Sequence, residues 1–160
     1  MSYVGEAGES SAIAVPFGTE RNLTFKSGTI GRFVAPGSLT AGRYGLYRWD
    51  MPASSGGAGG HFHRTFAESF YILDGSVTLF DGREWTVHGA GDFVYVPEGG
   101  THGFRNDSTA PASMLILFAP GIAREAYFEE LAAIAESGRT PSQEEWAALY
   151  ARHDQTMVEG

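Results

Sequence analysis

Between residues 43 and 118 the chain is a series of short apolar segments separated by turn residues, and this pattern limits the folds open to it. The segments are rich in aromatic and β-branched residues, which favour strands. They cover residues 43–50, 69–73, 76–80, 84–88, 92–97, 102–106 and 113–118. Parallel strands need long crossovers, for which these gaps leave no room. The pattern therefore predicts an all-β fold, an antiparallel barrel or sandwich.

Two Asp-Gly pairs fall between consecutive segments of this series, Asp74-Gly75 and Asp81-Gly82. Asp-Gly favours the positive φ angles of a type I′ turn, which joins antiparallel strands tightly. We therefore expect a hairpin at each pair.

The two ends of the chain differ from this central region. Residues 1–39 contain two further strand-like segments, 13–17 and 30–34, and we expect them to form an arm or edge strands packed on the barrel. Residues 52–60 form a loop rich in glycine and serine. No Lys-Ser or Lys-Thr follows that loop, so it is not a phosphate-binding loop.

After Pro120 the spacing of apolar residues becomes helical. Ile122, Tyr127, Leu131 and Ile134 recur at this spacing, and Gly138 is a natural stop.

A second helix is expected directly afterwards. Thr140 is the predicted cap, with Pro141 in the first turn and Gln143 closing a capping box. The whole chain, 1–160, is then one domain with an arm (1–39), a barrel (40–119) and two C-terminal helices (120–153).

Charge and cysteine content exclude several classes of function. The formal net charge is −8, which disfavours binding to nucleic acid or to anionic lipid. Cysteine is absent, so a metal ion would have to be held by nitrogen and oxygen donors.

The N-terminus lacks the pattern of a signal peptide and no apolar run is long enough to span a bilayer, so the expected location is cytoplasmic.

Histidines and a glutamate follow a spacing that could bring them together. On a strand, His61 and His63 would share a face, with Cα atoms about 6.6 Å apart. Glu68 lies at an odd offset from His63, so it can join them only if the chain bends near residues 64–67. His102 follows a predicted tight turn at 97–100. A lone histidine at a strand end is more often a hydrogen-bonded polar residue than a ligand, and the spacing alone does not decide between a polar residue of the core and a metal site.

These two segments resemble the two signature motifs of the cupin superfamily. The first motif, His-x-His-x4-Glu-x6-Gly, and the second, Gly-x5-Pro-x-Gly-x2-His-x3-Asn, are both met in full by the following positions: His61, His63, Glu68 and Gly75, then Gly91, Pro97, Gly99, His102 and Asn106. One position departs from the pattern, because Ser55 stands where the first motif usually begins with glycine.

The resemblance implies a cupin-type antiparallel β-barrel, also called a double-stranded β-helix or jelly roll. It implies one divalent transition metal ion held by His61, His63, Glu68 and His102. Fe, Mn, Ni, Co, Cu and Zn all accept such donors, and the ligand types do not choose among them. Gly75, Pro97, Gly99 and Asn106 would be framework residues.

Over residues 43–135 the chain resembles the small bacterial cupins grouped with quercetin 2,3-dioxygenase. This likeness implies a metal-dependent dioxygenase acting on a small aromatic or enolisable substrate, with dioxygen as a second substrate and Glu68 as the catalytic base. Phe70, Ile72 and Phe104 are candidate substrate-binding residues, because each is expected to share a face with a ligand residue. Cupins often pair through barrel edges, so a homodimer is expected.

The sequence leaves open two alternatives to the dioxygenase function. A non-oxidative isomerase, cyclase or lyase could use the same ion and the same proton transfer. A cupin that only binds a small molecule would need no catalysis at all.

Overall fold

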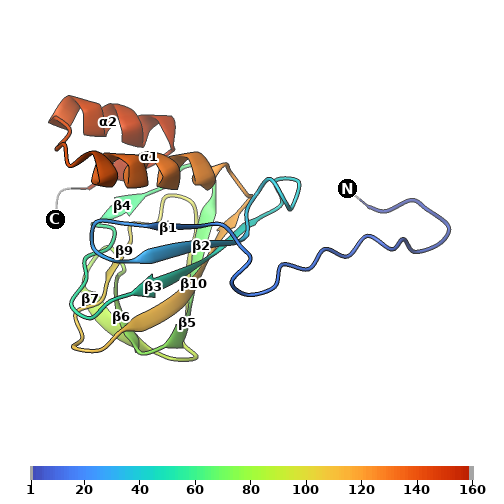
Figure 1. Ribbon diagram of the computed structural model, residues 1–160, viewed down its shortest axis with the longest axis horizontal. Helices are drawn as coiled ribbons and strands as arrows, with labels where there is room; N and C mark the ends of the chain where they lie inside the picture. Colours follow the sequence, from blue (N-terminus) through green and yellow to red (C-terminus); the bar gives the residue numbers. More distant parts are fainter. Residues whose placement is uncertain (1, 159–160) are drawn as a thin grey trace.

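Antiparallel strands make up most of the chain between residues 22 and 119, and two helices follow them (Figure 1). The computed structural model describes residues 2–158. The strands are β1 (Asn22–Thr24), β2 (Ile30–Ala35), β3 (Gly45–Met51), β4 (His61–Phe62), β5 (Ala67–Asp74), β6 (Ser76–Phe80), β7 (Trp85–Gly89), β8 (Phe93–Val96), β9 (Gly103–Arg105), β10 (Ala112–Ala119) and β11 (Thr156–Met157). The helices are α1 (Arg124–Ser137) and α2 (Gln143–Arg152).

The strands form two main antiparallel sheets and a short third one. The large sheet has the order β1-β2-β3-β10-β5-β8, and the second has the order β7-β6-β9. β11 pairs with β4 in a two-stranded ribbon. The predicted antiparallel β-barrel with two C-terminal helices is confirmed.

The core lies between the sheets, where alternate residues of each strand point inward. In β3, Tyr47, Trp49 and Met51 are buried while the residues between them are partly exposed. Across the sheet Ile116 of β10 lies opposite both Tyr47 and Phe70. This apolar interior fixes the strands that carry the candidate ligands.

The two Asp-Gly pairs have different roles in the structure. Asp81-Gly82 does lie in a hairpin between β6 and β7, but the loop has four residues because Phe80 pairs with Trp85. The hairpin predicted at Asp74-Gly75 is wrong, since β5 and β6 belong to different sheets. Gly75, with φ 69°, turns the chain from one sheet to the other, and a Cβ there would collide with the carbonyl of Pro111.

The helices begin and end at residues set by local capping. α1 ends at Gly138, which has the left-handed conformation expected of a stop (φ 65°). The predicted cap at Thr140 is wrong, because α2 begins after Ser142. The Ser142 hydroxyl accepts a hydrogen bond from the Glu145 backbone, and the Glu145 carboxylate accepts one from the Ser142 backbone. Thr140 with Gln143 and Ser142 with Glu145 both match the capping-box pattern. Only the pair Ser142 and Glu145 closes the box with a carboxylate, which the positive end of the helix dipole stabilises.

The N-terminal region divides into an arm and two edge strands. β1 and β2 add to the open edge of the large sheet, beside β3. The strand predicted at residues 13–17 is wrong, because Pro16 lacks a backbone donor and its carbonyl accepts from Thr19 in a turn. Residues 2–10 extend away from the barrel (Figure 1).

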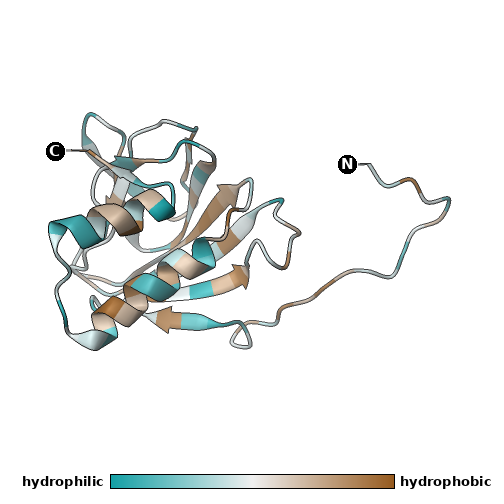
Figure 2. Cartoon of the chain, turned by 90° about the horizontal axis from the view of Figure 1, so that it is seen from above, coloured by the Kyte–Doolittle hydropathy of each residue, from teal (hydrophilic) through white to brown (hydrophobic). Residues whose placement is uncertain are grey.

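Helix α1 lies across one end of the barrel, and α2 packs beside it (Figures 1 and 2). The hydropathy colours show apolar stretches along the strands beneath these helices and both apolar and polar residues on α1 (Figure 2). Tyr127, Phe128 and Ala132 of α1 are buried, and the Phe128 ring packs 4.8 Å from the Trp49 ring and 5.1 Å from the Tyr47 ring. Neither helix within residues 2–158 meets the length and apolarity needed to cross a bilayer.

Candidate metal centre

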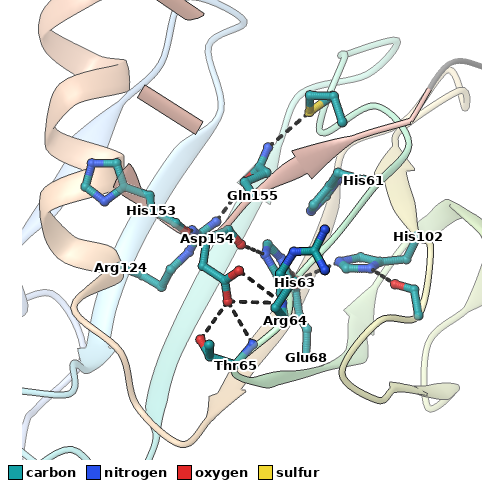
Figure 3. Close-up of polar contacts among 12 residues, drawn as sticks. His61, His63, Arg64, Thr65, Glu68, His102, Arg124, His153, Asp154 and Gln155 are labelled. Atoms are coloured by element: carbon teal, nitrogen blue, oxygen red, sulfur yellow. Dashed lines mark hydrogen bonds and ion pairs between the residues drawn. The ribbon is translucent and has the colours of Figure 1, made fainter. Parts of the chain in front are cut away.

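Four buried side chains converge inside the barrel at the end covered by the helices. One donor atom from each of His61, His63, Glu68 and His102 lies within 4.8 Å of the others (Figure 3). All four residues are less than 5% exposed. The structure thus brings together the four side chains that the sequence singled out, in an arrangement that could hold a metal ion.

Strand pairing and a chain bend produce this convergence. His61 and His102 face each other in an antiparallel bridge, with both N–H···O distances below 3.0 Å. β4 ends at Phe62 and β5 begins at Ala67, so the chain bends over the residues between them as Glu68 requires. The turn at 97–100 is closed by a hydrogen bond from Gly100 to Pro97, and Gly99 donates to the His63 carbonyl.

Each histidine ring is oriented by a hydrogen bond from Nδ1 to a backbone carbonyl. The acceptors are Gly59 for His61 (2.7 Å), Asp154 for His63 (2.6 Å) and Gly100 for His102 (2.9 Å). Because a carbonyl only accepts, Nδ1 carries the proton in all three rings, and a neutral ring then presents the Nε2 lone pair. Such outer contacts are the usual way in which proteins fix the tautomer of a metal-binding histidine.

The carboxylate of Glu68 completes the set of donors. Its Oε2 lies 3.1 Å from Nε2 of His63 and 2.7 Å from Nε2 of His102. A neutral imidazole has one N–H, already used at Nδ1, so these contacts require either charged rings or a cation between the carboxylate and the rings. Burying several charged rings together is costly, so the residues fit a metal ion.

The pKa values of these groups follow from burial and from their mutual contacts. Burial lowers the pKa of His61 to about 4, helped by the charge of His102, so the His61 ring is neutral at ordinary pH. Burial alone would raise the pKa of Glu68, but hydrogen bonds with His102 and His63 outweigh it and hold that pKa far below its usual value. Burial would lower the pKa of His102, but the contact with Glu68 outweighs it and raises that pKa.

A cavity of about 330 Å³ opens from the cluster toward the helices. His61 and Glu68 lie in its wall together with aromatic residues of the barrel and of α1, among them Trp49, Phe104, Phe118, Tyr127 and Phe128. Its volume and apolar lining suit a small organic molecule.

The three predicted substrate-binding residues differ in their relation to this cavity. Phe104 lines it, whereas Phe70 and Ile72 are buried in the barrel core and lie outside its wall. The Phe70 ring packs 5.9 Å from the rings of both His102 and Phe104 and so supports the wall from behind. Contact with substrate stays a prediction for all three.

Sequence reasoning missed the C-terminal segment after α2. β11 pairs with β4 beside His61, and the carbonyl of Asp154 accepts from His63 (Figure 3). The Asp154 carboxylate accepts from the backbone of Arg64 and Thr65 and from the Thr65 hydroxyl. No motif marks this segment, because its contacts are with residues about ninety positions away.

Arg124, the first residue of α1, was also missed. A charged residue in the first turn of a helix is usually exposed, yet Arg124 is buried and lines the cavity. Only the packing of α1 against the C-terminal segment reveals this position.

Comparison with known proteins agrees with this fold. Residues 47–118 match the family described as "Cupin domain". Quercetin 2,3-dioxygenase of Bacillus subtilis (strain 168) is 29% identical over 123 residues, which are 76% of this chain and 32% of that protein. The chain therefore spans about a third of the length of this curated relative.

Solved structures share the fold at low sequence identity. One is a sugar phosphate isomerase of the cupin superfamily from Silicibacter pomeroyi (TM-score 0.60, 17% identity, 67% of this chain and 75% of that one). Another is the polyketide cyclase RemF from Streptomyces resistomycificus (TM-score 0.57, 18% identity, 74% of this chain and 93% of that one). At such identities the likeness supports the fold and leaves the reaction open.

Proposed function

We propose that this chain, whose residues 47–118 match the cupin family model, is a cupin and acts as a metal-dependent dioxygenase on a small aromatic or enolisable molecule. The observation that carries the proposal is the position of Glu68: its carboxylate contacts two imidazoles and also faces an aromatic-lined cavity. The similarity to quercetin 2,3-dioxygenase supports the oxidative form of this chemistry.

His61, His63 and His102 would hold the ion through Nε2, and Glu68 would complete the set. A divalent transition metal ion would act as a Lewis acid that acidifies a coordinated hydroxyl or enol and offers a place for dioxygen.

Glu68 then serves as the general base. Its contacts with His63 and His102 lower its pKa, so the proton transfer depends on the ion, which would acidify the substrate oxygen. It takes the proton from the substrate hydroxyl or enol oxygen, and the resulting anion is the electron-rich species that reacts with dioxygen. Aromatic side chains from the barrel and from α1 hold the substrate body and exclude water.

A non-oxidative isomerase, cyclase or lyase would use the same ion and the same proton transfer without dioxygen. Binding without catalysis is the other alternative. The homodimer and the cytoplasmic location also stay predictions.

The test combines elemental analysis with a substrate screen under two atmospheres. We expect about one transition metal ion per chain, and oxygen consumption on addition of flavonols or other enolisable aromatics. If turnover were equal with and without dioxygen, the dioxygenase proposal would be wrong and the non-oxidative isomerase, cyclase or lyase would take its place. Stoichiometric binding with no product would leave a binding protein, and a chain that takes up no metal would overturn the proposal altogether.

A further inference from the structure

Arg124 is a buried cation without an acidic partner. It is 3% exposed and forms no ion pair within residues 2–158. Its two terminal nitrogens donate to the His153 carbonyl (2.8 Å) and to Oε1 of Gln155 (3.1 Å). Nε is buried without any hydrogen-bond partner. A guanidinium has five N–H groups, so most of the donor capacity of Arg124 is unused.

The surroundings of Arg124 compensate its charge only in part. The guanidinium carbon lies 4.1 Å from the centre of the Tyr127 ring and between 5.3 and 5.6 Å from those of Phe66, Phe118 and Phe128. Ring faces attract a cation, but much less than a carboxylate does. The cost of burying an unpaired charge falls when a ligand supplies the missing anion.

Arg124 shares the cavity with the candidate metal centre. Arg124, His61 and Glu68 all line it, and Glu68 is the only acidic residue among the described residues of its wall. A divalent ion at the cluster would outweigh the single Glu68 carboxylate, so the cavity would be positive at both places. Such a cavity favours an anionic ligand that reaches from Arg124 to the ion at the cluster.

We propose that Arg124 binds a carboxylate of the substrate, so that the substrate is a small aromatic or enolisable acid. The carboxylate would accept from two of the unused N–H groups of Arg124, the paired geometry that guanidinium groups favour. The ring or chain of the acid would lie against the aromatic wall. This inference rests on the proposed function for the reacting oxygen at the metal centre, but the anion site itself requires no metal.

The test compares a carboxylic acid with its neutral amide. 2-Hydroxybenzoate and 2-hydroxybenzamide are titrated calorimetrically into the full-length protein, once without metal and once loaded with Zn²⁺. The variants are Arg124→Met, which removes the charge, and Arg124→Lys, which keeps it. Arg139→Met is the matched control, because Arg139 is exposed and pairs with Glu145 outside the cavity.

We expect the wild-type protein to prefer the acid over the amide by about 10- to 100-fold, the value of a charge-assisted contact. Arg124→Met should lose this preference, Arg124→Lys should keep part of it, and Arg139→Met should keep all of it. If Arg124 only tied α1 to the C-terminal segment, Arg124→Met would weaken acid and amide equally.

Equal binding of acid and amide to the wild-type protein would overturn the inference, and so would a preference that survives in Arg124→Met. The same holds if neither compound binds the wild-type protein more tightly than about 1 mM. If Arg124→Met fails to fold, the relative affinities for acid and amide in the wild-type protein and in Arg124→Lys still test the inference. Because the metal-free protein is measured as well, failure of the anion site is distinguishable from failure of the metal chemistry.

Discussion

Replacing Asp154 by alanine removes the side chain that ties the C-terminal segment to the bend after His63. Its carboxylate accepts three donors: the backbone N–H of Arg64 at 3.0 Å, the backbone N–H of Thr65 at 2.9 Å and the Thr65 hydroxyl at 2.6 Å. Its own carbonyl accepts from Nδ1 of His63. Asp154 also has φ 51°, which a non-glycine residue adopts at a cost.

The expected loss of stability follows from these two features. Three charge-assisted hydrogen bonds at a partly buried site contribute about 1–3 kcal/mol together, below their fully buried value because water replaces them in part. Alanine in the left-handed region adds about 1 kcal/mol. Asp154→Ala should therefore lower the free energy of unfolding by about 2–4 kcal/mol, or the melting temperature by about 4–16 °C.

Two further variants separate the two contributions. Asp154→Gly removes the hydrogen bonds but not the tolerance for positive φ, so it should be about 1 kcal/mol more stable than Asp154→Ala. Asp154→Asn keeps an acceptor and tolerates this conformation, so it should lose least. Hydrogen bonds from Thr65 and Arg64 outweigh partial burial and lower the pKa of Asp154, so the carboxylate stabilises the fold above the usual Asp pKa. The advantage of wild type over Asp154→Asn should thus begin to decline as the pH falls below about 3.9 and vanish only as it falls through the lowered pKa of Asp154.

Metal affinity is the second measurement on the same variants. Loss of an outer partner of a histidine ligand usually weakens metal binding by about 10- to 100-fold. We expect this for Asp154→Ala in competition titrations against a chromophoric chelator, with thermal unfolding followed by circular dichroism. A variant that melts with wild type and keeps wild-type affinity would refute the role given to the C-terminal segment.

Four further predictions concern the cluster and the helices. Replacing His61 and His63 together by alanine should abolish metal content by elemental analysis and remove the stabilisation by the ion, about 2.7 kcal/mol at a free concentration a hundredfold above Kd; full retention of metal would contradict the ligand assignment. Glu68→Gln should keep most of the metal and lose about 10²- to 10⁴-fold in kcat, the contribution of a positioned base; parental turnover would make Glu68 only a ligand. Because Glu68 raises the pKa of His102, metal binding near neutral pH should release a proton from His102, and affinity should fall as the pH falls; titrations in buffers of different ionisation enthalpy would show no such release if the ring were already neutral. Truncation after Pro120 should expose the aromatic core beneath α1 and increase binding of a hydrophobic dye, and an unchanged, soluble barrel with unchanged ligand affinity would count against a covering role of the helices.

The sequence by itself determined the antiparallel sheet and the four candidate ligands. Enrichment in aromatic and β-branched residues, as in 43–50, favours a strand, and the short gaps between such segments leave no room for parallel crossovers; both are properties of neighbouring residues. The spacing of His61, His63 and Glu68 is likewise local, and it predicted the bend that Glu68 requires. That His102 joins the other three was implied by the resemblance to the two cupin motifs. The end of α1 at Gly138 follows from local chemistry in the same way.

Only the tertiary structure decided which polar groups are buried together. Asp74-Gly75 is a typical hairpin-turn sequence. Because β5 pairs with β8 and β10, however, Gly75 instead connects the large sheet to the sheet that contains β6. Arg124 has the position of a solvated residue at the start of a helix, and it is buried because α1 packs against the segment that contains His153 and Gln155. Asp154 supports His63 from 91 positions along the chain. Such contacts depend on which surfaces meet after the chain has folded, and no local spacing of residues encodes them.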